Sequence, residues 1–132
     1  MFKKQVNKFR LAALSVLLLL PFISFAQLIG YADLDTCKVY TDLSLALKNP
    51  SQVYRLHLKH KKLTEIPADV FKLSNLNELV LDRNKLTDIP DRITELPFLQ
   101  KLSINENKID TIKPSLMLLK NLIDLQLGDN YI

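Results

Sequence analysis

The two histidines of the chain, His57 and His60, are the first residues that could hold a metal or transfer a proton. A zinc site needs three or four nitrogen, sulfur or oxygen ligands close together. The neighbours of both histidines are instead Arg55 and Lys59, whose positive charges oppose the binding of a cation. We therefore interpret the histidines as solvated surface residues and expect no metal and no other cofactor.

The remaining nucleophilic side chains also lack catalytic partners. No serine lies in one of the motifs that mark hydrolases. The chain has only two glycines, which excludes a glycine-rich phosphate-binding loop. Cys37 is the only cysteine, so no intramolecular disulfide can form, and we interpret it as a buried or unpaired thiol. The sequence predicts that the protein is not an enzyme.

Positive charge is concentrated at the N-terminus. The full chain has 18 basic and 14 acidic residues, a net charge of +4, and residues 1–26 hold four of the basic residues and no acidic one. The rest of the chain therefore has 14 residues of each sign and no net charge. A nucleic-acid-binding domain needs a basic footprint on its folded part. We exclude nucleic acid as a partner.

The N-terminal segment has the pattern of a secretory signal peptide. A basic start is followed by the apolar residues 11–26, and Ser24-Phe25-Ala26 puts small residues before Gln27. We expect residues 1–26 to be removed and the protein to be exported, as a periplasmic, cell-surface or secreted protein. The alternative is a retained membrane anchor, because residues 11–32 carry no charge and about 20 apolar residues span a bilayer. The intact mass of the exported protein distinguishes the two.

The rest of the chain is built from an internal repeat. Three blocks align without gaps at a period of 23 residues, over 53–75, 76–98 and 99–121, and a partial block follows at 122–132. Positions 1, 4, 6, 11, 14, 18 and 21 of the block are apolar in all 25 instances. Such regularity is the signature of a repeat architecture, in which each block buries its apolar face only against its neighbours.

The blocks resemble the leucine-rich-repeat family, whose pattern is L-x-x-L-x-L-x-x-N-x-L. Three segments match it, with Asn84, Asn107 and Asn130 at the polar position. The Ile-Pro pairs that follow are similar to the short 23-residue class, and Lys61 and Lys113-Pro114 depart from the pattern. The resemblance covers residues 53–132. It implies a right-handed α/β solenoid that binds a protein, with a short parallel sheet on its concave face.

The spacing of the apolar residues predicts the course of each block. The alternation at positions 4 and 6 indicates a strand, and the wider spacing that follows indicates a helical or 3₁₀ return on the convex side. The asparagine turns the chain between them and satisfies backbone groups in the turn. Residues 40–52 are expected to form an N-terminal cap, with Thr41 or Asp42 capping a short helix. We interpret residues 27–39 as an extended leader that is not ordered.

Side chains at positions 3, 5, 7 and 8 are expected to point from the concave face. Position 3 alternates in sign, so neighbouring strands face opposite charges. Val80 is the only apolar residue of this face, and the basic end at Arg55 and Lys59 is opposite an acidic end at Asp124 and Asp129. A dipolar face suits a protein partner, although the charge column could also serve only to stack the blocks. The residues of this candidate binding face are Arg55, His57, Lys59, His60, Glu78, Asp82, Arg83, Lys101, Asn105, Glu106 and Asp124.

Two further surfaces have alternative interpretations. Lys62, Lys85 and Lys108 form a row along one rim, which is either a solvated edge or a contact for an acidic surface. The partial block leaves its outer side uncovered, and open apolar edges invite pairing with another chain. We expect either a homodimer through this C-terminal edge or a natural chain that continues past Ile132. The protein would then be a structural or assembly piece without a ligand of its own.

Overall fold

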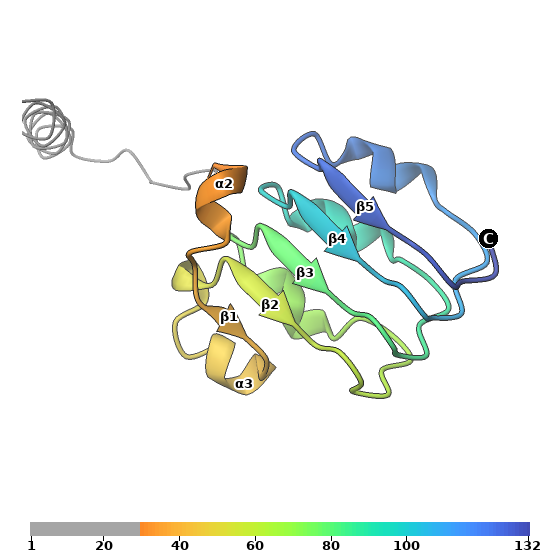
Figure 1. Ribbon diagram of the computed structural model, residues 1–132, viewed down its shortest axis with the longest axis horizontal. Helices are drawn as coiled ribbons and strands as arrows, with labels where there is room; N and C mark the ends of the chain where they lie inside the picture. Colours follow the sequence, from red (N-terminus) through yellow and green to blue (C-terminus); the bar gives the residue numbers. More distant parts are fainter. Residues whose placement is uncertain (1–29) are drawn as a thin grey trace, which may run out of the picture.

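The computed structural model describes residues 30–132, so the predicted signal peptide, residues 1–26, lies outside the described residues. The fold is a solenoid with one parallel sheet, in which the strands follow each other in sequence order (Figure 1). Within residues 30–132 no helix is long and apolar enough to cross a membrane. The strands are β1 (Val39–Tyr40), β2 (Arg55–His57), β3 (Glu78–Val80), β4 (Lys101–Ser103) and β5 (Asp124–Gln126).

The strands pair in the register that the 23-residue period demands. Leu56 pairs with Leu79, Leu79 with Leu102 and Leu102 with Leu125, so equivalent positions lie side by side in neighbouring coils. We call each repeat block a coil and number the coils one to four along the chain. The predicted leucine-rich solenoid with a parallel sheet is thereby confirmed.

The return paths are short 3₁₀ helices on the opposite side from the sheet (Figure 1). Each of the last three follows a residue with extended backbone dihedrals, which is Pro67, Pro90 or Lys113. Proline fixes φ near −65° and so prepares the chain to enter the helix. The 3₁₀ helices are η1 (Pro50–Gln52), η2 (Ala68–Lys72), η3 (Asp91–Glu95) and η4 (Pro114–Leu118).

The core is a stack of apolar columns between the sheet and the 3₁₀ helices. Leu56, Leu79 and Leu102 are fully buried, and Val70 and Ile93 cover them from the helical side. Burying a leucine or valine side chain contributes about 1.5–3 kcal/mol. A single coil has no opposite wall, so this stabilisation exists only between coils.

Two segments cover the outer side of coil one. Asp42 accepts hydrogen bonds from the backbone N–H groups of Ser44 and Leu45, at 2.8 and 3.3 Å, and so caps helix α3 (Leu43–Ala46). Helix α3 buries Ala46 completely against the core. The hydroxyl of Ser44 and these two N–H groups hold the pKa of Asp42 below its usual value. The apolar end of the solenoid is therefore closed at this side.

The expectation that residues 27–39 form an extended, unordered leader is wrong for the described part. Residues Tyr31–Leu34 form helix α2, and β1 extends the sheet by pairing with β2. The side chain of Leu34 is 2% exposed. The edge of β2 would otherwise present unpaired backbone groups, which β1 satisfies. A two-residue strand and a one-turn helix have no periodicity that a sequence pattern could reveal.

The asparagines tie each coil to the one before it. The Oδ1 atom of Asn84 accepts hydrogen bonds from the N–H groups of Lys61 and Leu63, at 3.0 and 3.1 Å. Its Nδ2 atom donates to the carbonyl oxygen of Leu58 in coil one and to that of Leu81 in its own coil, at 2.8 and 2.7 Å. One amide therefore satisfies four backbone groups that no strand can reach.

Asn107 and Asn130 repeat this pattern one and two coils further on. Asn107 accepts from the N–H of Leu86 and donates to the carbonyl of Leu81. Asn130 accepts from the N–H of Ile109. Each asparagine needs a preceding turn to bond, and the cap does not supply one to coil one. This accounts for Lys61 at the equivalent position, where the side chain is exposed.

We predict that Asn107→Ala lowers the free energy of unfolding by about 2–4 kcal/mol, because it leaves several buried backbone groups without partners. Asn130→Ala should cost about 1 kcal/mol, because this asparagine is only half-buried at the end of the stack. Urea unfolding of both variants measures the difference. Equal losses at the two positions would contradict the assignment of the asparagine as the joint between coils.

Candidate functional site

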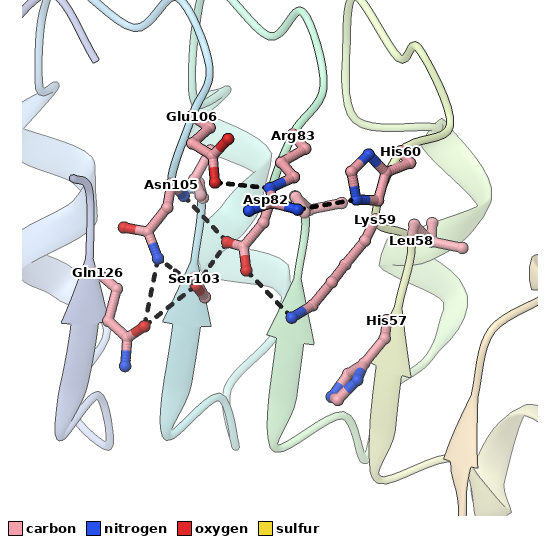
Figure 2. A network of polar contacts seen from close by, with 12 residues as sticks. His57, Leu58, Lys59, His60, Asp82, Arg83, Ser103, Asn105, Glu106 and Gln126 are labelled. Carbon is pink, nitrogen blue, oxygen red and sulfur yellow. Dashed lines mark hydrogen bonds and ion pairs between the residues drawn. The ribbon is translucent and has the colours of Figure 1, made fainter. Parts of the chain in front are cut away.

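The candidate site is the outward face of the sheet together with the turns that follow its strands. We call it the polar sheet face, meaning positions 3, 5, 7 and 8 of each coil. Figure 2 shows that its side chains come from neighbouring coils and point toward one another. The single apolar residue, Val80, is 3% exposed, so the accessible surface of this face is polar.

The column at position 3 begins with a partly buried ion pair. The guanidinium of Arg55 donates from Nε to Oε2 of Glu78 at 2.8 Å and from Nη2 to Oε1 at 3.3 Å. The two side chains are 13% and 3% exposed. The expectation of an exposed basic end at Arg55 is therefore wrong. The neighbouring carboxylate of β3 neutralises this charge, and Asp35 lies beside it at 3.5 Å.

Glu78 has a second partner in the same strand pair. The Nε2 atom of His57 lies 2.5 Å from Oε1 of Glu78. Burial alone would raise the pKa of Glu78, but the hydrogen bonds from Arg55 and His57 and the charge of Arg55 outweigh it, so the pKa lies below its usual value. His57 is therefore not a solvated histidine, as we had interpreted it, because it closes this cluster.

The other half of the column is looser. The Nζ atom of Lys101 lies 3.8 Å from a carboxylate oxygen of Asp124, and each side chain is about a quarter exposed (28% and 26%). The alternating charges at position 3 thus form two ion pairs, one between β2 and β3 and the other between β4 and β5. Opposite charges across a sheet contribute about 0.2–1 kcal/mol each. The looser pair is the part of the column that a partner can reach.

A chain of one ion pair and two hydrogen bonds links position 7 across all four coils. Lys59 pairs with Asp82, with 3.3 Å between Nζ and Oδ2. Oδ1 of Asp82 accepts from the backbone N–H of Asn105 at 3.0 Å, and Oδ1 of Asn105 accepts from the N–H of Gly128 at 2.7 Å. A Cβ atom at Gly128 would lie 3.2 Å from that oxygen, so a larger residue there requires the Asn105 side chain to shift slightly.

Two residues that the sequence analysis missed complete this chain. The hydroxyl of Ser103 donates to Oδ1 of Asp82 at 2.6 Å, and Nδ2 of Asn105 donates to Oγ of Ser103 at 3.0 Å and to Oε1 of Gln126 at 3.3 Å (Figure 2). Both missed residues occupy position 5, between the charged columns. Their small or amide side chains at the same position of adjacent coils are the signal that could have revealed them.

Position 8 forms the outermost row. Its residues His60, Arg83, Glu106 and Asp129 all have positive φ angles between 53° and 58°. This conformation is uncommon for residues other than glycine. Arg83 donates from Nε to Oε1 of Glu106 at 2.6 Å, and its Nη1 lies 3.5 Å from Nε2 of His60. The hydrogen bond to Glu106 and the negative charge of that residue raise the pKa of Arg83 above its usual value.

A shallow cleft of about 230 Å³ lies among these side chains, lined by Lys59, His60, Asp82, Arg83, Asn105 and Glu106. The lining has both charges close together and no apolar residue. Within residues 30–132, every buried side-chain nitrogen or oxygen has a hydrogen-bond partner. The same residues contain no group of three or more histidine, cysteine, aspartate or glutamate side chains that could hold a metal ion. The face therefore presents a fixed arrangement of donors and acceptors.

We predict that Glu78→Gln flattens the dependence of stability on pH. A carboxyl whose folded pKa is depressed adds stability above its unfolded value of 4.5, and this stability is lost as the pH falls through the lower folded pKa. Urea midpoints above and below pH 4.5 measure the slope. Glu106→Gln removes an exposed carboxylate and serves as the control. Identical slopes for the wild type and Glu78→Gln would contradict the prediction.

Comparisons with known proteins agree with the repeat architecture described above. A family model described as leucine rich repeat matches residues 51–109. A leucine-rich-repeat protein of Leptospira interrogans is 36% identical in sequence with a TM-score of 0.66, and the match covers 70% of this chain and 24% of that protein. An internalin of Listeria monocytogenes is 27% identical with a TM-score of 0.54, over 67% of this chain and 24% of that one.

No curated protein matches this sequence. The chain spans about a quarter (24%) of the length of either solved structure. The repeat region of this chain belongs to the leucine-rich-repeat family.

Proposed function

We propose that this protein is an exported protein-interaction module that binds its partner through the polar sheet face. The observation that carries the proposal is the network from Lys59 through Asp82 and Asn105 to Gly128, which fixes polar groups across four coils. Groups that are already fixed lose little conformational entropy on binding. The basic, then apolar, N-terminus with its small-residue exit supports export.

The composition of the face sets the strength of the interaction. The chain has no tryptophan, and the face has no exposed aromatic side chain of the kind that dominates tight interfaces. Affinity therefore comes from hydrogen bonds and charge complementarity, which act mainly on association rate and specificity. We infer a transient or multivalent contact. Among the lysines and arginines of the face, Lys59 and Arg83 are the most exposed, with side chains 48% and 54% exposed.

A structural role is the second candidate, and the end of coil four favours it. Ile123, Leu125, Tyr131 and Ile132 are between 40% and 71% exposed, and β5 pairs only with β4 among the described strands. A second copy or a further coil would bury these side chains and pair with the strand edge. Sedimentation over a range of concentrations tests the homodimer. The double variant Ile123→Lys, Tyr131→Lys should remain monomeric if this edge is the contact.

The double variant Lys59→Glu, Arg83→Glu tests the polar sheet face. A partner is captured from the envelope fraction with the tagged full chain, and its binding is then measured against salt concentration. The variant should lower the association rate by about tenfold and change the salt dependence. The double variant Lys72→Glu, Arg92→Glu is the matched control, because it reverses one lysine and one arginine in exposed pairs on the convex side. Equal losses in both variants would rule out the sheet face.

A further inference from the structure

A row of three exposed lysines forms no ion pair within residues 30–132. Lys62, Lys85 and Lys108 occupy position 10 of coils one to three, in the turns that leave the arrowheads of the strands in Figure 1. All three residues are exposed. We call them the lysine edge. It lies beyond the asparagine of each turn and is separate from the polar sheet face.

Backbone hydrogen bonds hold the lysine edge in register. The N–H of Lys85 donates to the carbonyl of Leu63 at 2.7 Å, and the N–H of Lys108 donates to the carbonyl of Leu86 at 2.8 Å. Lys85 and Lys108 are therefore each anchored to the preceding coil at the equivalent place. Neighbouring parallel coils lie about 4.8 Å apart. The turns thus present one ammonium group per coil along the stacking direction.

Most other lysines and arginines of the repeat region form ion pairs, and among the described residues of that region only Lys61 and Lys120 lack one as the lysine edge does. On the sheet face Arg55, Lys59, Arg83 and Lys101 each pair with a carboxylate of a neighbouring coil. On the convex side Lys113 bridges to Asp88 in the preceding coil. The three residues of the lysine edge form no ion pair with any described residue. Like charges one coil apart repel one another, and no ion pair within residues 30–132 offsets that repulsion.

We propose that the lysine edge is a docking site for an extended acidic segment of a partner protein, which runs along the stacking direction of the coils. Carboxylates of such a segment would relieve the repulsion among the three lysines. Side chains on one face of an extended segment repeat about every 6.6–6.8 Å. The flexible four-carbon stem of lysine spans the difference of about 2 Å from the coil spacing.

The neighbours of the lysine edge determine the shape of its ligand. Acidic residues follow the lysines within three positions of the turn, at Glu65, Asp88 and Asp110, and position 8 before them holds His60, Arg83 and Glu106. Acidic groups therefore border the lysine edge on the side that follows it in each turn. A flat anionic bilayer would meet those acids as well as the lysines. A single extended chain contacts the lysines alone, so the geometry favours a linear acidic segment.

The test uses the full chain and a fluorescent peptide in which glutamate alternates with serine. The edge variant carries Lys62→Glu, Lys85→Glu and Lys108→Glu. The control variant carries Lys48→Glu, Lys72→Glu and Lys120→Glu, which gives it the same net charge from exposed lysines elsewhere. A third variant with glutamine at the three edge positions replaces the edge variant if charge reversal prevents folding.

The wild type should bind the peptide at low salt, and binding should weaken as salt rises. The edge variant should bind about tenfold or more weakly, and the control should stay within about twofold of the wild type. A control that loses as much as the edge variant would overturn the proposal, as would a wild type that does not bind at all. Tighter, lysine-dependent binding to phosphatidylglycerol vesicles than to the peptide would assign the edge to membranes instead. None of these variants alters the polar sheet face, so the two proposals can fail separately.

Discussion

The side-chain amide of one asparagine per turn is the interaction on which the solenoid depends. A leucine-rich coil must reverse direction after a strand of only three residues, and the backbone groups of that turn face the core. Buried backbone groups without partners each cost about 1–3 kcal/mol. Asn84 and Asn107 are 8% and 6% exposed and satisfy these groups in their own coil and in the preceding one. The stacking of two coils and the formation of the turn between strand and return path therefore depend on the same side chain.

The same register that aligns the asparagines also builds the surface. Because equivalent positions lie side by side, the residues at any one position of the block form a continuous column across the coils. Opposite charges at position 3 become ion pairs, and acceptors at position 7 receive the next coil's backbone N–H. Like charges at position 10 cannot pair and stay exposed. The polar groups of the sheet face therefore pair with one another, whereas the lysine edge stays unpaired, because different residue types repeat at these positions.

The sequence was sufficient to predict the period, the parallel sheet, its register and the polar face, because all four follow from spacing. It was not sufficient to predict the low exposure of Arg55. The alternating charges at position 3 predict which side chains pair, but they do not predict how much of each side chain the rest of the protein covers. It also missed Asn77 and Gln100, two buried amides at position 2, where Nε2 of Gln100 donates to Oδ1 of Asn77 at 2.7 Å. A polar residue at an unassigned position looks solvated until its neighbouring coil is placed.

Native-state hydrogen exchange tests the asparagine joint most directly. The backbone N–H groups of Leu63, Leu86 and Ile109 donate to the side-chain oxygens of Asn84, Asn107 and Asn130 in the following coil. If these amides join the coils, those of Leu63 and Leu86 should exchange only by global unfolding, with protection within about tenfold of the β3 and β4 amides. Ile109 should be less protected, because Asn130 lies in the last coil. Exchange of Leu63 and Leu86 at the rate of exposed turn amides would contradict the account.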